Sequence, residues 1–279
     1  MSSAVDLDEP PAANPGVRGA PPRRRRDWGR TLFRGIGQTL ITLGLVALLF
    51  VGYELWVTDL IAAQDQEQLS EEIHEQWRDD PTVAPAPAPA APVEQPFTPA
   101  PISVGVGDPF AVLHIPRLAA DYSRVIVEGA AQDQLAQGPG HYIGTAMPGE
   151  QGNLAIAGHR VGRGSPFLDL DQMRPGDPIV VETADAWFVY RVLGDPATGS
   201  FDGDPSGIPG QEIVRPEAVS VISPTPGGPA EGPASGAYLT LTTCHPKYSA
   251  QQRLIIHARL DGAPISKATA PDGPPALAG

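Results

Sequence analysis

The sequence contains one cysteine, Cys244, among its 279 residues. A chain with a single thiol cannot form an internal disulfide, so its fold must be stable without such cross-links. The sequence shows no metal-ligand spacing of cysteine and histidine, no glycine-rich phosphate loop after a strand, and no internal repeat. We therefore expect neither a metal ion nor an organic cofactor.

Positive charge is also scarce. Lysine and arginine number 19 against 32 aspartates and glutamates, which gives a formal net charge of −13. The arginine run at residues 23–26 is the one strongly basic stretch, and it lies directly before an apolar segment. Everything after that segment is net acidic, so the chain lacks the basic surface that nucleic-acid binding requires. We expect no nucleic-acid partner.

Long hydrophobic runs are absent except at residues 35–53. As a helix, this run would span roughly 28 Å, close to the thickness of a bilayer core. Arginines precede it and acidic residues follow it, which favours a cytoplasmic N-terminus. The competing interpretation is a cleaved signal peptide, but the run is long and no Ala-x-Ala site directly follows. We predict a cytoplasmic tail at 1–34, a transmembrane signal anchor at 35–55, and a single-pass protein of the cell membrane with its remaining residues extracellular.

Three segments outside the anchor are predicted to lie apart from the main core. Residues 56–80 have helical periodicity, with an apolar stripe at Ile61, Leu69, Ile73 and Trp77. They predict a stalk helix or a weak partner helix, with a solvated acidic helix as an equal alternative. Residues 81–101 are rich in proline and alanine and predict an extended linker. Residues 263–279 contain few core-forming side chains and predict a flexible tail. One folded domain remains, at residues 102–262, which is long enough for a single core.

Within this domain, short runs of strand-forming residues alternate with turn signals. The predicted strands are residues 110–115, 125–127, 153–157, 178–181, 187–193, 219–222, 239–244 and 253–260. Two short helices are predicted at residues 131–137 and 166–173. About eight strands separated by turns indicate a mainly β fold, a closed or nearly closed β-barrel.

Cys244 ends one predicted strand, and Arg253 begins the next. A thiol at a strand end beside an arginine is a candidate nucleophile with an oxyanion partner. The alternative is a buried free cysteine that acts as a small hydrophobic residue.

The six histidines differ in their sequence surroundings. His159 follows a hydrophobic strand and Gly158, and it precedes Arg160, which is the setting of a side chain that faces a cleft. Of the other five, His74 lies on the predicted stalk helix and is expected to be solvated. His114 and His257 lie within strands, where a hydrogen-bonded structural histidine is expected, and His141 and His245 lie at loop starts. A nucleophilic thiol needs a group that favours the thiolate and later protonates a leaving amine, and histidine can do both. Arginine supplies a fixed positive donor for the intermediate.

The set of Cys244, His159 and Arg253 resembles the catalytic set of the sortase family. The resemblance rests on the run Thr240-Leu241-Thr242-Thr243-Cys244, on Gly158-His159-Arg160, on the arginine of the following strand, and on the N-terminal anchor. The runs at residues 140–142, 148–153 and 244–248 look like those of class E sortases from high-GC Gram-positive bacteria. Class D sortases share much of this pattern.

The resemblance implies an eight-stranded β-barrel and a cysteine transpeptidase. Cys244 would attack the Thr–Gly carbonyl of a C-terminal sorting signal of the LPXTG or LAXTG type on a surface protein, and His159 would protonate the departing amine. Arg253 would hold the oxyanion or the signal backbone. The thioester would pass to an amine of a cell-wall precursor, normally the lipid II cross-bridge. A pilin-polymerising sortase and a non-catalytic barrel that binds cell-wall components remain alternatives.

Two further residues are predicted to contact the substrate, Tyr142 and Thr243. The resemblance to class E associates a tyrosine at the position of Tyr142 with acceptance of alanine at the second signal position. An aromatic ring can wall off the pocket that a proline would fill, and its hydroxyl can bond the amide that alanine has and proline lacks. The alternative is a tyrosine that packs on the barrel with its hydroxyl in water.

Overall fold

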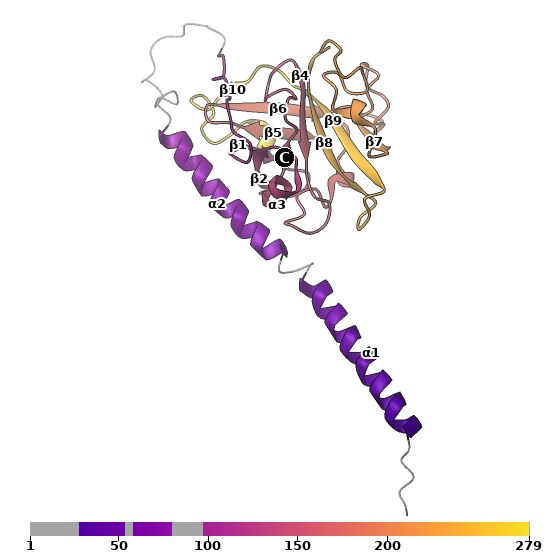
Figure 1. Cartoon of the computed structure of the whole chain (residues 1–279). Coiled ribbons are helices and arrows are strands. Elements are labelled where there is room, and N and C mark those ends of the chain that lie inside the picture. The colour runs from indigo at the N-terminus through magenta and orange to yellow at the C-terminus, as the bar shows by residue number, and fades with distance from the viewer. Residues whose placement is uncertain (1–27, 54–57, 80–96, 279) are drawn as a thin grey trace, which may run out of the picture. The chain divides into compact units, whose positions relative to one another are not determined.

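The computed structural model describes residues 28–53, 58–79 and 97–278. The chain divides into two compact units, residues 1–49 and residues 50–279. The first unit contains most of one long helix, and the second contains a second helix and a β-barrel (Figure 1).

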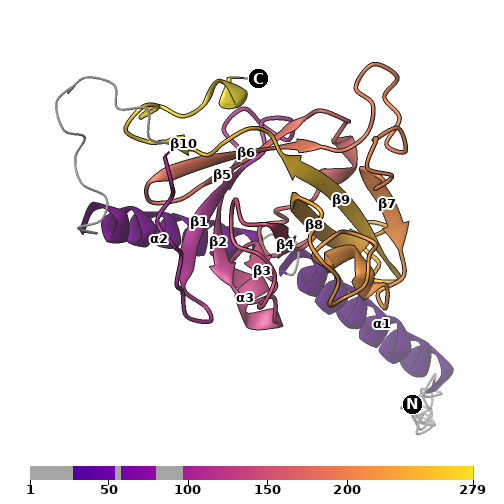
Figure 2. The same ribbon diagram turned by 90° about the horizontal axis from the view of Figure 1, so that it is seen from above.

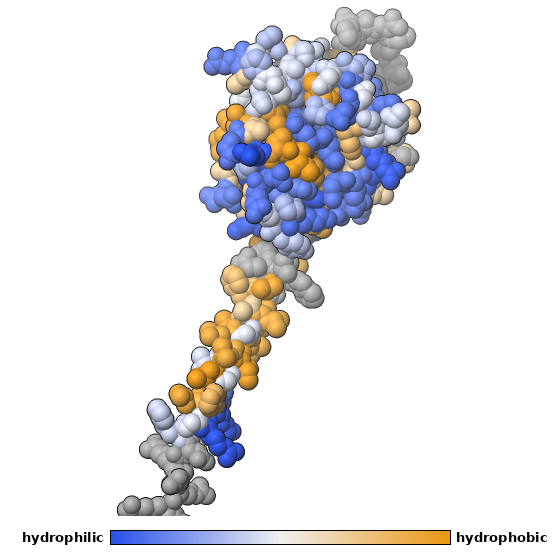
Figure 3. All heavy atoms as spheres, turned by 90° about the vertical axis from the view of Figure 1, so that its right-hand side faces the viewer, coloured by the Kyte–Doolittle hydropathy of each residue, from blue (hydrophilic) through white to orange (hydrophobic). Residues whose placement is uncertain are grey.

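The first helix, α1 (Trp28–Gly52), has no buried residue. Apolar side chains cover most of its surface (Figure 3). Two of its threonine hydroxyls are satisfied within the helix, since Thr39 and Thr42 donate to carbonyls four residues earlier. Among the described helices, α1 alone is long and apolar enough to cross a membrane. The predicted apolar helix is confirmed, and it begins before the apolar run; its orientation in a membrane stays a prediction.

The second unit is built on a sheet of ten strands. These are β1 (Pro109–His114), β2 (Ser123–Glu128), β3 (Gly140–His141), β4 (Gly152–Ala157), β5 (Pro178–Glu182), β6 (Ala186–Val192), β7 (Gln211–Val214), β8 (Ala237–His245), β9 (Gln252–Leu260) and β10 (Ile265–Ser266). The strand order is β10-β6-β5-β1-β2-β3-β4-β8-β9-β7, and an additional pairing of β6 with β9 closes the ring. The closed barrel therefore has eight strands, as predicted, while β7 and β10 lie outside the ring (Figure 2).

Alternation along β8 separates the core from the outer face of the barrel. Leu239 and Leu241 belong to the main hydrophobic core, together with Leu254 and Ile256 of β9. Because successive side chains of a strand point to opposite faces, Thr240, Thr242 and Cys244 face away from that core.

Two segments of the barrel differ from the sequence prediction. Residues 219–222, predicted as a strand, form a 3-10 helix, η3 (Val219–Ile222), since side chains of Asn153 and Thr240 bind the Val221 carbonyl in place of a strand partner. The helix predicted at residues 166–173 is reduced to the 3-10 turn η2 (Leu170–Gln172), and the Leu168 carbonyl accepts from Arg160 instead of continuing a helix. The other short helix, α3 (Gln132–Gln137), forms where predicted.

The predicted stalk helix forms as α2 (Thr58–Asp79), and it packs on the barrel. Ile73 is fully buried and forms a cluster with Val112 and Val125, beside the partly buried Leu69 and Trp77. The apolar stripe is thus correct at Leu69, Ile73 and Trp77. It is wrong at Ile61, which is 47% exposed while its neighbour Ala62 is buried.

The segment after β9, expected as a flexible tail, makes ordered contacts through residue 278. Strand β10 pairs with β6, and the indole Nε1 of Trp187 donates to the Ala270 carbonyl at 3.0 Å. Ala276 and Leu277, in the 3-10 turn η4 (Pro275–Leu277), pack against Trp187 and Val189. The segment packs on an apolar cluster of Val180, Trp187 and Val189, which belong to β5 and β6.

Candidate active site

Strand register brings the three predicted catalytic residues to one edge of the barrel. Strands β4 and β8 are parallel neighbours, with Ala157 opposite Thr242. His159 and Cys244 each follow two residues later, so they lie at the same level, His159 just beyond β4 and Cys244 near the end of β8. Strand β9 is antiparallel to β8, and Arg253 lies directly opposite Cys244.

Two hydrogen bonds lock the ends of β4 and β8 together beside these residues. The Gly158 amide donates to the Thr242 carbonyl at 3.0 Å, and the Thr243 hydroxyl donates to the Gly158 carbonyl at 2.8 Å. Thr243 is buried, and its hydroxyl already has this partner within the protein. Its contact with substrate stays a prediction. Its observed contact joins the residue before His159 to the residue before Cys244.

Cys244 is a free, half-buried thiol. Its position on β8 places it on the outer face with Thr242, away from the hydrophobic core. A reactive thiol must be partly accessible to meet a substrate, whereas a purely structural cysteine is normally enclosed in the core. The exposure of Cys244 therefore favours the nucleophile over the buried alternative.

His159 is half-buried on the loop after β4. Its Nε2 is enclosed, and it has no hydrogen-bond partner in the part of the chain that the structure describes. Burial, and then the nearby positive charge of Arg163, lower the pKa of His159 below its ordinary value of 6.5. The neutral imidazole is thus favoured in the free protein, ready to accept a proton.

Close packing explains why a glycine precedes His159. A Cβ at Gly158 would lie 2.5 Å from Cδ2 of Phe167, which no side chain could tolerate without movement. Phe167 in turn donates its amide to the His159 carbonyl at 3.1 Å. The absence of a side chain at Gly158 therefore lets the Phe167 ring pack against the backbone directly before His159.

Arg253 is half-buried, and its guanidinium bends toward the β8–β9 turn. Its Nη1 donates to the carbonyls of Ala250 and Gln252, both at 3.0 Å. Within residues 28–53, 58–79 and 97–278, no carboxylate forms an ion pair with it. Neutral carbonyls hold the side chain without cancelling its charge, so that charge remains available to an anion at Cys244.

Tyr142 approaches the same outer face. Its hydroxyl forms a 3.0 Å hydrogen bond with the Thr242 hydroxyl, and its amide donates to the Ala155 carbonyl. Thr242 shares its face with Cys244, so the ring borders the floor of the site. The hydroxyl is bonded to a side chain, which differs from the alternative of a hydroxyl in water.

The structure gives positions and partners for two charged residues near the site to which the sequence assigned no role. Arg160 is 3% exposed; its Nη2 pairs with Asp171 at 2.8 Å, and its Nε donates to the Leu168 carbonyl. Lys247, in the turn after Cys244, pairs with Asp169 at 2.8 Å. Both pairs attach the site loops to the segment around η2. The sequence pointed to Arg160 only through its position directly after His159, and nothing in the sequence showed that the Arg160 side chain is buried.

Three other histidines have structural partners. His141 is fully buried, with its Nδ1 2.7 Å from Glu128 and its Nε2 2.8 Å from the Thr145 hydroxyl. His257 lies between Thr240 and Glu212. His114 bonds Glu182 at 2.8 Å. The expectation of structural histidines within strands is met for His114 and His257, and His141 fixes the residue next to Tyr142.

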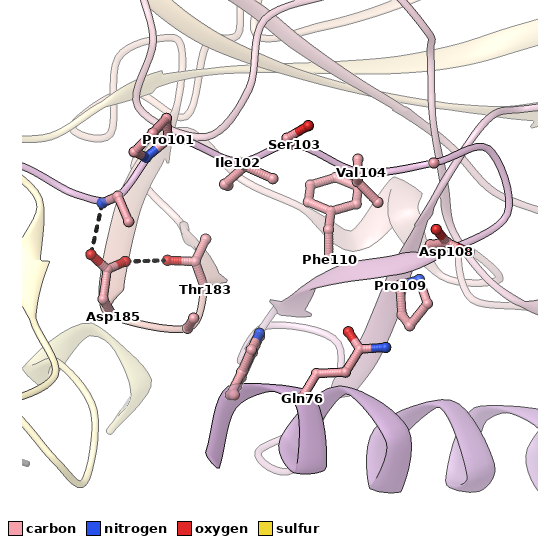
Figure 4. Close-up of a pocket in the computed structure, with 14 residues that line it drawn as sticks. Gln76, Pro101, Ile102, Ser103, Val104, Asp108, Pro109, Phe110, Thr183 and Asp185 are labelled. Carbon is pink, nitrogen blue, oxygen red and sulfur yellow. Dashed lines mark hydrogen bonds between the residues drawn. The ribbon is translucent and has the colours of Figure 1, made fainter. Parts of the chain in front are cut away.

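A pocket of about 290 Å³ lies apart from this edge. It is lined by α2, by the segment before β1 and by the β5–β6 turn, with Gln76 on one side and Pro101, Ile102 and Val104 on the other (Figure 4). No residue of β4, β8 or β9 lines it. Among the described residues, no group of three or more His, Cys, Asp or Glu side chains could hold a metal ion.

A family model described as Sortase domain matches residues 113–261. The chain belongs to the sortase family. Sortases are cysteine transpeptidases, and the single cysteine at the end of β8 agrees with that chemistry.

Named sortases of two genera are similar to the chain. Sortase SrtE1 of Streptomyces coelicolor is 35% identical over 235 residues, which are 81% of this chain and 56% of that protein. Sortase SrtE2 of the same organism is 28% identical over 270 residues, 93% of each protein. The structure of the SrtF sortase from Corynebacterium diphtheriae superposes with a TM-score of 0.58 at 38% identity, over 66% of this chain and 98% of that chain. The Streptomyces matches support the predicted class E resemblance.

Proposed function

We propose that this sortase cleaves a C-terminal sorting signal of the LAXTG or LPXTG type between threonine and glycine. It then joins the shortened protein to an amine of a cell-wall precursor. The observation that carries the proposal is the register that places His159, Cys244 and Arg253 at one barrel edge. That edge combines a nucleophile, a proton carrier and an anion partner, the three functions that acyl transfer requires.

The first half of the reaction forms a thioester. The Cys244 thiol gives its proton to His159, and the thiolate attacks the threonine carbonyl carbon. Arg253 stabilises the negative charge that develops on the carbonyl oxygen. When the tetrahedral intermediate collapses, the C–N bond breaks, and the leaving glycine amine takes the proton from His159. The fragment that begins with glycine leaves, and the rest of the protein remains attached to Cys244 as a thioester of its new C-terminal threonine.

The second half reverses the proton transfers. The acceptor amine attacks the thioester carbonyl and gives its proton to His159, and the collapse of the second intermediate releases Cys244. A new amide then joins the surface protein to the acceptor. The acceptor that fits an anchored enzyme is the cross-bridge amine of lipid II, because an acceptor fixed to the same membrane needs no diffusion through the wall. An extracellular barrel and a cytoplasmic N-terminus belong to this proposal.

The thioester can be tested directly with the full-length protein in detergent micelles. A sorting peptide without an acceptor amine should leave an adduct on Cys244, detected by mass spectrometry and removed by hydroxylamine.

Substitutions test the role of each residue. Cys244→Ala should abolish cleavage. Arg253→Ala should lower kcat/KM by about 10²–10³-fold, the usual cost of one oxyanion donor. His159→Ala should lower it by about 10²–10⁴-fold, the usual contribution of general acid–base catalysis. Cleavage that proceeds without any adduct would overturn the proposal, and binding of the peptide without cleavage would favour a non-catalytic barrel.

A further inference from the structure

Helix α2 reaches the loop that holds His159. Ala62 is only 3% exposed, although it lies in the first turns of this mostly polar helix. A Cβ placed on Gly164 would lie 3.2 Å from the Cβ of Ala62, closer than an ordinary carbon–carbon contact of about 3.5–4.0 Å. A methyl group added at Gly164 would therefore force the helix or the loop to move by a few tenths of an ångström.

Hydrogen bonds of Gln66 hold α2 in this position. Its Oε1 accepts from the Val125 amide at 2.8 Å, and its Nε2 donates to the Gln137 carbonyl at 2.7 Å and to the Val125 carbonyl at 3.3 Å. One side chain thus bonds the backbone of β2 and the end of α3. Together with the buried Ile73, Gln66 attaches α2 along the β1–β2 side of the barrel (Figure 1).

The loop itself has an unusual backbone. Four successive residues have positive φ: Gly162 (73°), Arg163 (53°), Gly164 (75°) and Ser165 (41°). Two of them are not glycine, and such conformations persist only where the surroundings hold them. Its far end is fixed by Tyr122, whose buried hydroxyl donates to the Pro166 carbonyl at 2.8 Å. Between that anchor and β4, Ala62 contacts the loop from α2.

We propose that α2 helps to form the active site. In this proposal Ala62 is a positioning residue that fixes the loop carrying His159 through its proximity to Gly164. The inference rests on the proposed role of His159. Helix α2 thereby does more than connect the anchor to the barrel. A small side chain is required at both positions, because added volume at either one must displace the loop or lift the helix.

A matched pair of glycines separates this contact from backbone strain. Gly162 and Gly164 have nearly the same φ, 73° and 75°, but a Cβ at Gly162 would meet nothing within 4 Å. Gly162→Ala therefore reports the backbone cost alone. Gly164→Ala should lower kcat about tenfold further with KM little changed, since even small misplacements of a catalytic group are costly. The double variant Ala62→Gly/Gly164→Ala exchanges the two methyl positions and should recover most of that loss.

A second pair tests the helix side. Ala62→Leu should lower kcat about tenfold, while Ala63→Leu, on the exposed face of the same helix turn, should not. All variants are compared as full-length protein in micelles, with circular dichroism as a check of folding. Amide hydrogen exchange of residues 159–165 should accelerate in Gly164→Ala and in Ala62→Leu. It should return to the wild-type rate in the double variant Ala62→Gly/Gly164→Ala. The His159 pKa, followed by NMR, should shift in the same variants.

The outcomes separate the two proposals. Equal kcat and equal exchange in Gly162→Ala and Gly164→Ala would overturn the positioning role of α2. Full activity of His159→Ala would instead remove His159 from the reaction. In that event the exchange measurements alone decide whether α2 holds the loop.

Discussion

At the scale of single residues, the site depends on how a few charges are placed. His159 is half-buried beside Arg163, and Arg253 is held by neutral carbonyls. The uncompensated charge of Arg253 lies at the edge that contains Cys244, where it can stabilise an oxyanion. The neutral imidazole of His159 can accept a proton from Cys244.

Arg163 provides a direct test of the His159 environment. Burial and the Arg163 charge both lower the pKa of His159, because each disfavours the imidazolium. Arg163→Gln removes one cause, so we expect the His159 pKa to rise toward 6.5 and the corresponding limb of the pH profile of kcat/KM to move to higher pH. NMR titration of the imidazole measures the His159 pKa, and peptide cleavage at a series of pH values measures the profile of kcat/KM. Arg215→Gln, at an exposed arginine of another loop, is the control, and an unchanged titration in Arg163→Gln would contradict the assignment.

Tyr142 makes a prediction about specificity. If its ring and hydroxyl favour alanine at the second signal position, wild type should cleave LAXTG peptides faster than LPXTG peptides. Tyr142→Phe keeps the ring and loses the bond to Thr242. Tyr142→Ala loses both, and its preference ratio should fall by about 10-fold, the scale of one pocket contact. Competition between the two peptides, read by mass spectrometry, gives the ratio. An identical ratio in all three proteins would show that Tyr142 is not the selector.

At the scale of elements, long strands were predictable and short ones were not. Strands β1, β2, β4, β5, β6, β8 and β9 form where apolar runs predicted them, because each contributes alternate side chains to the core. Strand β3 has two residues and β7 has four, too few to show a period. Residues 219–222 have strand-forming side chains, but Asn153 and Thr240 bind the Val221 carbonyl there.

The docking of α2 yields a stability prediction at this scale. Gln66 satisfies the Val125 amide and the Gln137 carbonyl, so Gln66→Ala leaves partly buried polar groups without a partner. We expect a loss of about 1–3 kcal/mol in the free energy of unfolding. Gln68→Ala, on the exposed face of the helix, should change it by less than about 0.5 kcal/mol. Urea unfolding followed by tryptophan fluorescence measures both. Equal midpoints for the two variants would show that α2 contributes no stability through Gln66.

At the scale of the whole molecule, the chain consists of an apolar helix followed by one catalytic unit. That unit begins at residue 50, so it includes α2 as well as the barrel. The proline-rich residues 81–101 therefore fall within the second unit and not between the two units. The prediction for residues 81–101 falls mostly outside the described residues.

Membrane topology is the prediction that belongs to this scale. Arginines before α1 and acidic residues after it predict a cytoplasmic N-terminus and an external barrel. Protease added to intact protoplasts should digest the barrel and spare an N-terminal fragment, detected with a terminal epitope tag. A barrel protected until the membrane is permeabilised would reverse the orientation. Release of the whole barrel without protease would indicate a cleaved signal peptide.

The sequence by itself determined the class of fold and predicted the candidate catalytic residues. A single thiol, a histidine after Gly158 and an arginine on the next strand were readable because reactive groups must be specific residue types. The tertiary structure alone decided which residues surround them. The burial of Arg160 beside Asp171 depends on how the loop after β4 folds back. The bond of Thr243 to Gly158 and the position of Ala62 beside Gly164 depend on contacts between segments far apart in the chain. Periodicity records only which side of an element is apolar, whereas strand register and helix docking decide what that side meets.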